Sequence, residues 1–160
     1  MKIQYNQTFA IQSTQYCNFI SANGSTRQTL CVTKPWLNIN EQWKILLHSD
    51  TGSTANVKFG DIISFSNQAY NPAYLSGFNG YSAPELTTMD AMQDYERWQL
   101  VNPSDPSSTA EVTTCDEFTL LLVNGGTLSA QVTEDDIQPS IPLVSSGAST
   151  FRLIQTSVSS

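Results

Sequence analysis

The fold is decided by three stretches of the sequence, which read EQWKIL at 41–46, ERWQLV at 96–101 and STFRLI at 149–154. Each has the pattern aromatic-x-aliphatic, and the three aromatic residues are 55 and 53 residues apart. Self-similarity at a long, nearly constant step is typical of repeat architectures. The sequence therefore predicts three copies of one unit, each of about 50 residues.

Two further sets of residues recur in the same order at similar steps. The central sets read NFISA at 18–22, AYLSG at 73–77 and GTLSA at 126–130, and the starting sets read FAI at 9–11, ISF at 63–65 and FTL at 118–120. A unit of this size with one apolar face is not stable alone, so the copies must share one core. We expect a single domain over 1–160, with copy one at 1–48, copy two at 55–103 and copy three at 110–156.

Within each copy the hydrophobic period is two rather than 3.6. Phe118, Leu120 and Leu122 alternate with polar residues, as do Ile63 and Phe65. Alternation of this kind indicates half-buried strands, and clusters of Asn, Gly and Ser between the runs indicate turns. Each copy accommodates about four short strands. The sequence therefore predicts an all-β domain of twelve short strands.

Three four-stranded copies that each close with an aromatic-x-aliphatic strand resemble a β-trefoil. The closing EQW and ERW are similar to the Gln-x-Trp of ricin-B-like lectin domains, with Glu in place of Gln, and copy three has Ser149-x-Phe151. The stretch VKFGDIISF at 57–65, followed by Tyr74-Leu75-Ser76, resembles fascin-like and MIR-type trefoils. We assign no subfamily. The resemblance implies a β-trefoil and, as the leading function, a soluble lectin.

The amino-acid composition argues against several classes of partner. Ser, Thr, Asn and Gln make up 60 of the 160 residues, whereas charged residues make up 13%. The net charge is −7 with only 7 Lys and Arg, which argues against nucleic acid or an anionic membrane surface as a partner. The longest apolar runs, such as LLLV at 120–123, are too short for membrane insertion. The first residues form no hydrophobic signal region, so we expect a cytoplasmic protein or one secreted without a classical signal peptide.

Aromatic and amide residues gather in the expected loops of copies one and two. Flat apolar rings that stack on a sugar, together with neutral amides that bond its hydroxyl groups, are the usual chemistry of carbohydrate contact. The same residue types also serve protein contacts, and ordinary polar turns would contain them too. The candidate stacking residues are Trp36, Tyr70 and Tyr81, and the candidate hydroxyl-binding residues are Asn38, Asn67, Asn71 and Asn79.

Other functions remain open at this point. A trefoil can bind proteins instead, as a protease inhibitor with NPSDP at 102–106 as its inserted loop, or as the binding module of a toxin or defence protein. His48 is the only histidine, and no nucleophile, phosphate-loop, dinucleotide or metalloprotease motif accompanies it. We therefore expect no enzyme, catalytic residue, metal or cofactor. The expected partners are glycans or glycoproteins, with a homodimer required for cross-linking if each chain has one site.

Several residues have structural interpretations. Trp43, Trp98 and Phe151 should form a layer in the core. Asp61 and Asp116 open equivalent strands and should bond turn backbone groups, with a sugar-hydroxyl acceptor as the alternative. The odd number of cysteines, three, argues against a disulfide framework, and whether Cys17 and Cys31 are joined stays open.

Overall fold

The computed structural model describes residues 1–15, 17, 19–23, 28–32, 39–69, 73–77, 85–87, 96–123, 127–133, 136–140 and 150–155. The regular structure of these residues is all-β, apart from the short 3-10 turn η1 (Ile39–Glu41). None of them forms a helix long and apolar enough to cross a bilayer. The strands are β1 (Thr8–Ser13), β2 (Phe19–Asn23), β3 (Gln28–Val32), β4 (Trp43–Leu47), β5 (Ile62–Asn67), β6 (Tyr74–Ser76), β7 (Glu85–Thr87), β8 (Trp98–Val101), β9 (Thr119–Leu122), β10 (Ser129–Thr133), β11 (Asp136–Ser140) and β12 (Phe151–Gln155).

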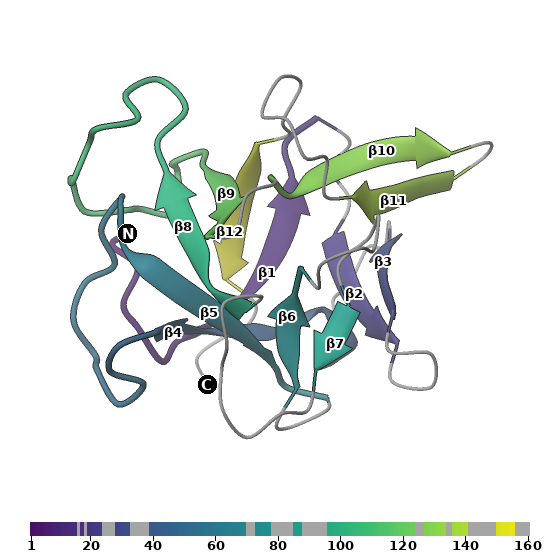
Figure 1. Ribbon diagram of the computed structural model, residues 1–160, viewed down its shortest axis with the longest axis horizontal. Coiled ribbons are helices and arrows are strands. Elements are labelled where there is room, and N and C mark those ends of the chain that lie inside the picture. The colour runs from purple at the N-terminus through teal and green to yellow at the C-terminus, as the bar shows by residue number, and fades with distance from the viewer. Residues whose placement is uncertain are drawn as a thin grey trace.

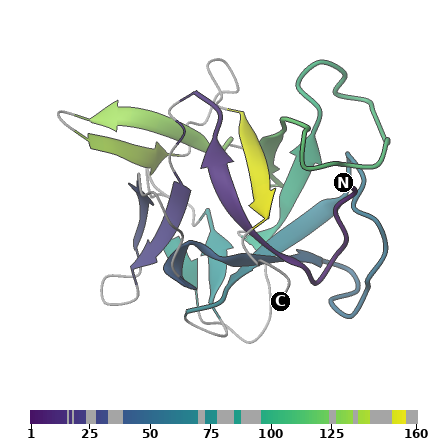
Figure 2. The same cartoon turned by 180° about the vertical axis from the view of Figure 1, so that it is seen from behind.

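The first and last strands of the copies close into a barrel. β1 pairs with β4 and β12, β4 with β5, β5 with β8, and β8 with β9. The ring closes between β9 and β12, because the backbone groups of Phe118 and Phe151 exchange hydrogen bonds of 2.9 and 2.8 Å. Figure 2 shows β12 beside β1, so the first and last strands of the chain meet in the barrel wall. A closed ring leaves none of these strands with an unpaired edge.

The remaining strands form three hairpins, β2–β3, β6–β7 and β10–β11. In Figure 1 they lie to the right of the barrel, whereas the N-terminus and the connections 48–61 and 102–117 lie to its left. β3 and β7 also pair with one another, through Gln28 and Glu85. The two ends of the barrel therefore carry different parts of each copy, with hairpins at one end and the links between copies at the other.

A ring of backbone hydrogen bonds joins the three copies at the linker end. Ile3 N donates to Val112 O (3.0 Å), Val112 N donates to Val57 O (2.8 Å), and Val57 N donates to Ile3 O (2.8 Å). All three side chains are fully buried. The three positions are 54 and 55 residues apart, so equivalent residues of the three copies are bonded here in a pseudo-threefold arrangement.

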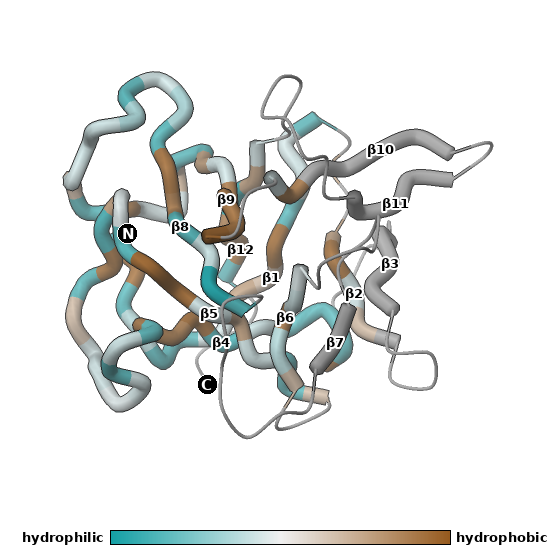
Figure 3. Tube along the Cα trace, in the orientation of Figure 1, coloured by the Kyte–Doolittle hydropathy of each residue, from teal (hydrophilic) through white to brown (hydrophobic). Residues whose placement is uncertain are grey.

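The aromatic residues that close each copy lie in the core, as the sequence predicts. Each is paired with a buried residue in, or directly before, the first strand of its own copy, and none of these side chains is more than 1% exposed. Figure 3 shows the hydrophobic colouring concentrated along the barrel strands, with hydrophilic residues in the links. The facing pairs are Phe9 with Trp43, Ile63 with Trp98, and Phe118 with Phe151.

Copies one and two bury a polar unit beside this layer. Trp43 Nε1 donates to Ile20 O at 3.0 Å, and the Ser21 hydroxyl donates to Glu41 Oε2 at 3.0 Å. In copy two, Trp98 Nε1 donates to Leu75 O at 3.0 Å and Ser76 Oγ to Glu96 Oε2 at 2.9 Å. Both glutamates are at most 1% exposed. The Glu-x-Trp signature is therefore structural, because its side chains bond the closing strand of a copy to the hairpin of the same copy.

The turn interpretation of the strand-opening residues is confirmed. Each of them accepts a hydrogen bond from the backbone N–H three residues earlier, which satisfies a donor within the turn. The bonds are Lys58 N to Asp61 Oδ2 (3.0 Å), Thr113 N to Asp116 Oδ2 (2.8 Å) and Gln4 N to Gln7 Oε1 (3.2 Å).

The cysteine question is answered for Cys17. Cys17 and Cys115 are exposed free thiols, so Cys17 is not joined to Cys31. Cys17 has a positive φ of 58° in the turn after β1, and its carbonyl accepts a bond from Gln12 Nε2 at 3.3 Å.

Candidate functional site

Only one of the sequence-predicted contact residues lies within the described residues. Asn67 ends β5 with its side chain fully buried. Its Nδ2 donates to Asn40 O at 3.0 Å, and its Oδ1 accepts from Ala69 N at 2.9 Å. A buried side chain bonded on both sides supports the loop and does not reach solvent, so we leave it out of the glycan-contacting set. The other six, Trp36, Asn38, Tyr70, Asn71, Asn79 and Tyr81, lie outside the described residues.

Asn67 nevertheless shows how two predicted contact segments are anchored. Its bond to Asn40 O fixes the end of β5 against η1, and Gln68 N donates to Gln42 O at 3.0 Å. Its backbone N–H donates to Ala73 O at 2.8 Å. The residues that follow segment 33–38 therefore lie beside residues that precede and follow segment 70–72. The barrel brings the flanks of these two segments together although they are far apart in the sequence.

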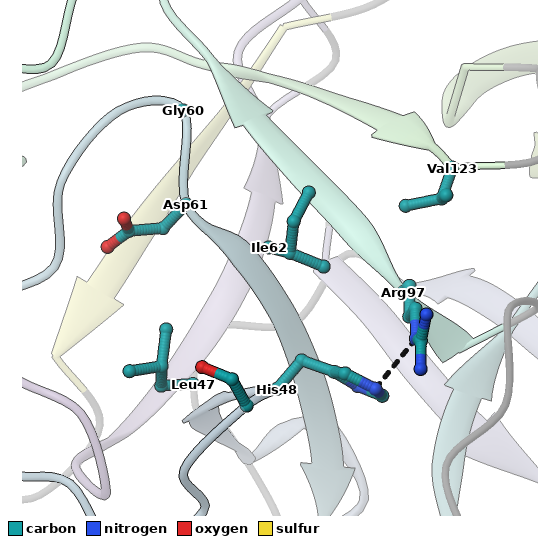
Figure 4. A pocket seen from close by; sticks show the side chains of 8 residues that line it. Leu47, His48, Gly60, Asp61, Ile62, Arg97 and Val123 are labelled. Atoms are coloured by element: carbon teal, nitrogen blue, oxygen red, sulfur yellow. Dashed lines mark hydrogen bonds between the residues drawn. The ribbon is translucent and has the colours of Figure 1, made fainter.

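A pocket of about 730 Å³ opens on the side of the barrel, where copies one and two meet (Figure 4). Its walls are formed by the end of β4 and the link after it, by the turn before β5 and the first residue of β5, and by the residues directly before β8 and after β9. The residue after β9, Val123, belongs to copy three. The pocket combines apolar, hydroxyl, carboxylate and cationic groups. Its lining residues are Leu47, His48, Ser49, Gly60, Asp61, Ile62, Arg97 and Val123.

A chain of hydrogen bonds fixes the polar end of this pocket. Arg97 Nε donates to His48 Nε2 at 2.7 Å, so that ring nitrogen is unprotonated. The other ring nitrogen, Nδ1, lies 3.3 Å from Ser64 Oγ, which itself donates to Glu96 O at 2.8 Å. The consistent assignment is a neutral imidazole with its proton on Nδ1, donating to Ser64. The buried Ser64 hydroxyl orients His48, and His48 in turn orients the guanidinium of Arg97.

Asp61 forms the other end of the pocket. Its Oδ2 accepts from the Tyr5 hydroxyl at 2.5 Å and from Lys58 N at 3.0 Å. Burial, followed by the hydrogen bond and the charge of Asp61, raises the pKa of Tyr5 well above its usual range. Tyr5 therefore remains a neutral donor to Asp61. In Figure 4 the Asp61 carboxylate and the Arg97 guanidinium lie on opposite sides of Ile62.

A second pocket, of about 270 Å³, occupies the related position between copies three and one. Five of the described residues line it, and the symmetry steps match each one to a residue in or beside the first pocket. Gln7 corresponds to Asp61, Thr8 to Ile62, Phe9 to Ile63, Gln42 to Arg97 and Gln155 to Leu47.

Backbone bonds confirm this correspondence independently of the pockets. Val123 N donates to Arg97 O at 3.1 Å, and Gln68 N donates to Gln42 O at 3.0 Å. Thr14 N donates to Thr150 O at 3.1 Å at the third equivalent place. The same frame therefore presents an arginine in one pocket and a glutamine in the next. The described residues contain no cluster of side chains that could hold a metal ion.

The sequence analysis missed the His48–Arg97 pair. The two residues are 49 positions apart, and His48 falls in a link that has no fixed place in the repeat. Aligning the three closing stretches does place Arg97 opposite Gln42, directly before the core tryptophans. That difference in charge between equivalent positions was the available signal.

No protein-family model and no curated protein matches the sequence. Solved structures do resemble the fold over almost the whole chain. The SDF2-like protein from Arabidopsis thaliana has a TM-score of 0.81 at 11% identity, covering 97% of this chain and 96% of that one. The designed threefold-symmetric protein ThreeFoil has a TM-score of 0.63 at 14% identity, covering 92% and 97% of the two chains. SeviL, solved bound to asialo-GM1 saccharide, has a TM-score of 0.63 at 14% identity, covering 94% and 98%.

These likenesses show the fold. The chain has an all-β, β-trefoil-like architecture, in agreement with the resemblance that the sequence suggests. At identities this low, a shared fold carries no function by itself.

Proposed function

We propose that the protein is a carbohydrate-binding protein, a lectin that recognises glycans through loops of copies one and two. The observation that carries this proposal is the anchoring of two candidate segments. Asn67 and Gln68 fix the flanks of 33–38 and 70–72 next to one another. Trp36 and Asn38 belong to the first segment, and Tyr70 and Asn71 to the second. Segments whose flanking residues are held together can contribute rings and amides to one sugar.

The chemistry of the chain agrees with this proposal. A sugar presents neutral hydroxyl groups and an apolar C–H face, so its partners are amides, hydroxyls and aromatic rings rather than a field of charge. The surface of this protein is mostly uncharged, with 60 Ser, Thr, Asn and Gln residues and 13% charged residues. A structure with the same fold, SeviL, was solved with a bound saccharide, which gives the frame a precedent for this ligand class.

The protein-binding alternative rests on the link NPSDP at 102–106. This link is largely exposed, but it folds into two tight turns, in which Asp105 N donates to Asn102 O at 3.2 Å and Ser108 N to Asp105 O at 2.9 Å. The Asp105 carboxylate also accepts from the Ser107 hydroxyl at 2.9 Å. Extended segments are the usual form for main-chain recognition by a partner. The tight turns therefore favour the glycan proposal over a substrate-like inhibitor loop.

A glycan-array screen of the purified protein tests the proposal, with a charge-matched control protein alongside. We expect a coherent group of bound glycans that share one terminal sugar. A blank array at high protein concentration would contradict the proposal. The next experiment would then be a panel of serine and cysteine proteases, where inhibition would support the protein-binding alternative.

A further inference from the structure

We propose that the pocket between copies one and two, lined by His48, Arg97, Asp61, Ile62 and Val123, binds the carboxylate of an acidic saccharide. This inference rests on the proposed function, and it assigns an additional site and a ligand class. The described residues that line the pocket come from the barrel strands and from the links next to them.

Arg97 provides the group that recognises the acid. A guanidinium is planar and binds a carboxylate with two parallel hydrogen bonds, which makes arginine the preferred residue for this contact. The 2.7 Å bond from Nε to His48 fixes the orientation of that plane before a ligand arrives. His48 is itself oriented by Ser64, whose side chain is fully buried. Orientation in advance reduces the entropy that binding would otherwise cost.

The apolar wall provides the second part of the recognition. Val123 is 47% exposed, and Ile62 and Leu47, which also line the pocket, are half-buried. An apolar surface next to a cation does not suit an inorganic ion, which is hydrated on every side. It does suit a ligand that carries a C–H face beside its charged group.

Asp61 provides the third part, at the end of the pocket away from Arg97. Its Oδ2 is bonded by Tyr5 and Lys58, and among the described residues no donor is recorded for Oδ1. A carboxylate oxygen accepts from a hydroxyl group and repels a second anion. The pocket therefore matches a molecule with one carboxylate, an apolar face and hydroxyl groups, which is the description of an acidic sugar.

The related pocket between copies three and one supplies an internal control. It has the same backbone frame, but Gln42 takes the place of Arg97 and Gln7 that of Asp61. An uncharged amide cannot form the charge-assisted pair with a carboxylate. Arg97→Gln therefore replaces the guanidinium with the residue that the related pocket already has at the equivalent position.

The test is a nuclear magnetic resonance titration of the full chain, with N-acetylneuraminic acid and glucuronic acid as acidic probes and galactose and N-acetylglucosamine as neutral probes. We expect both acids to shift the Arg97 Nε–H and His48 ring signals, and the neutral sugars to leave these signals in place. Arg97→Gln should weaken binding of the acids by about tenfold or more, since a charge-assisted hydrogen bond is lost. Gln42→Ala, in the related pocket, is the matched control and should not change their affinity.

The outcomes separate this inference from the proposed function. If neutral sugars shift signals elsewhere and the acids leave Arg97 and His48 unmoved, the acidic site is overturned and the lectin proposal stands. If none of the four sugars shifts any signal, the acidic site is overturned, and the glycan array decides the lectin proposal. If the acids bind but Arg97→Gln, with a spectrum of a folded protein, binds them equally well, the assignment to this pocket is overturned.

Discussion

Copies one and two differ from copy three at the same place in the barrel. In the first two, a buried glutamate and tryptophan each bond to the hairpin of their own copy, through Ser21 and Ile20 or through Ser76 and Leu75. Copy three has Ser149-x-Phe151 in the sequence at this place, and phenylalanine has no N–H to donate. The backbone pairing is nevertheless the same, since Phe151 faces Phe118 as Trp43 faces Phe9.

This difference separates what the fold requires from what individual copies add. The closed barrel and the ring of Ile3, Val57 and Val112 need backbone groups and apolar volume at fixed positions. The Glu-x-Trp unit adds local polar bonds within that frame and is dispensable in one copy of three. We therefore expect the mutations that remove buried apolar volume to lower the free energy of unfolding most. Mutations that only break a polar bond should lower it less.

The largest effect should come from removing the core aromatics. Trp43→Ala should lower the free energy of unfolding by about 3–5 kcal/mol, because it leaves a cavity in a close-packed interior. Phe151→Ala should cost a similar amount, since its side chain is 1% exposed. Urea unfolding of both variants measures this. A loss several-fold smaller for Phe151→Ala would show that copy three does not share the core equally.

A smaller effect should follow from removing one buried carboxyl. Glu96→Ala leaves the buried Ser76 hydroxyl without its acceptor, and we expect a loss of about 1–3 kcal/mol. Glu96→Gln keeps an oxygen at that position and should retain most of the stability. Thermal and urea unfolding of the two variants compare them. Equal stability of the Ala variant and the unmutated protein would show that the unit contributes nothing to the frame.

A third comparison uses the position that Tyr5 shares with Phe59. The two are 54 residues apart and make equivalent backbone bonds to Ala55 and Ala110, but only Tyr5 has a hydroxyl, which donates to Asp61. Tyr5→Phe should therefore cost about 1 kcal/mol at neutral pH. Phe59→Tyr is the reverse change, and Asp116 occupies the position equivalent to Asp61, so the added hydroxyl should not destabilise the protein. Unchanged stability of Tyr5→Phe would contradict the assigned partner.

The smallest effect is the pH dependence of the same bond. The pKa of Tyr5 is raised in the folded state, first by burial and then by Asp61. The unfolded chain releases this proton near pH 10, whereas the folded chain retains it. The stabilisation is therefore complete below about pH 10 and is lost as the pH rises above that value. The stability difference between the unmutated protein and Tyr5→Phe should shrink accordingly, and a constant difference at alkaline pH would contradict this.

The sequence predicts the frame well because the frame is repetitive. Residues such as Trp43, Trp98 and Phe151 recur at steps that a single sequence reveals, and all are buried as expected. For Asn67 the repeat and the loop prediction disagree. The strand register places it opposite Trp43, as it places Ser13 opposite Phe151, so the repeat assigns it to the barrel interior rather than to a loop.

The candidate pocket was beyond the sequence for a physical reason. His48 lies in an irregular link, and Arg97 is the residue before β8. Only the pairing of β5 with β4 and β8 brings Arg97 Nε within 2.7 Å of His48 Nε2. The repeat specifies strand positions, whereas side chains at the boundaries between copies depend on tertiary pairing. Differences between equivalent residues, such as Arg97 and Gln42, are the part of the sequence that points to such sites.

The central claim is that glycan recognition belongs to the loops of copies one and two. The most direct measurement is the affinity of the strongest array ligand for the variant with Trp36→Ala, Tyr70→Ala and Tyr81→Ala, beside Thr109→Ala as an exposed control. We predict a loss of at least about tenfold for the triple variant and none for the control, since truncated aromatic anchors dominate the loss of binding energy. Unchanged affinity of a folded triple variant would contradict the account.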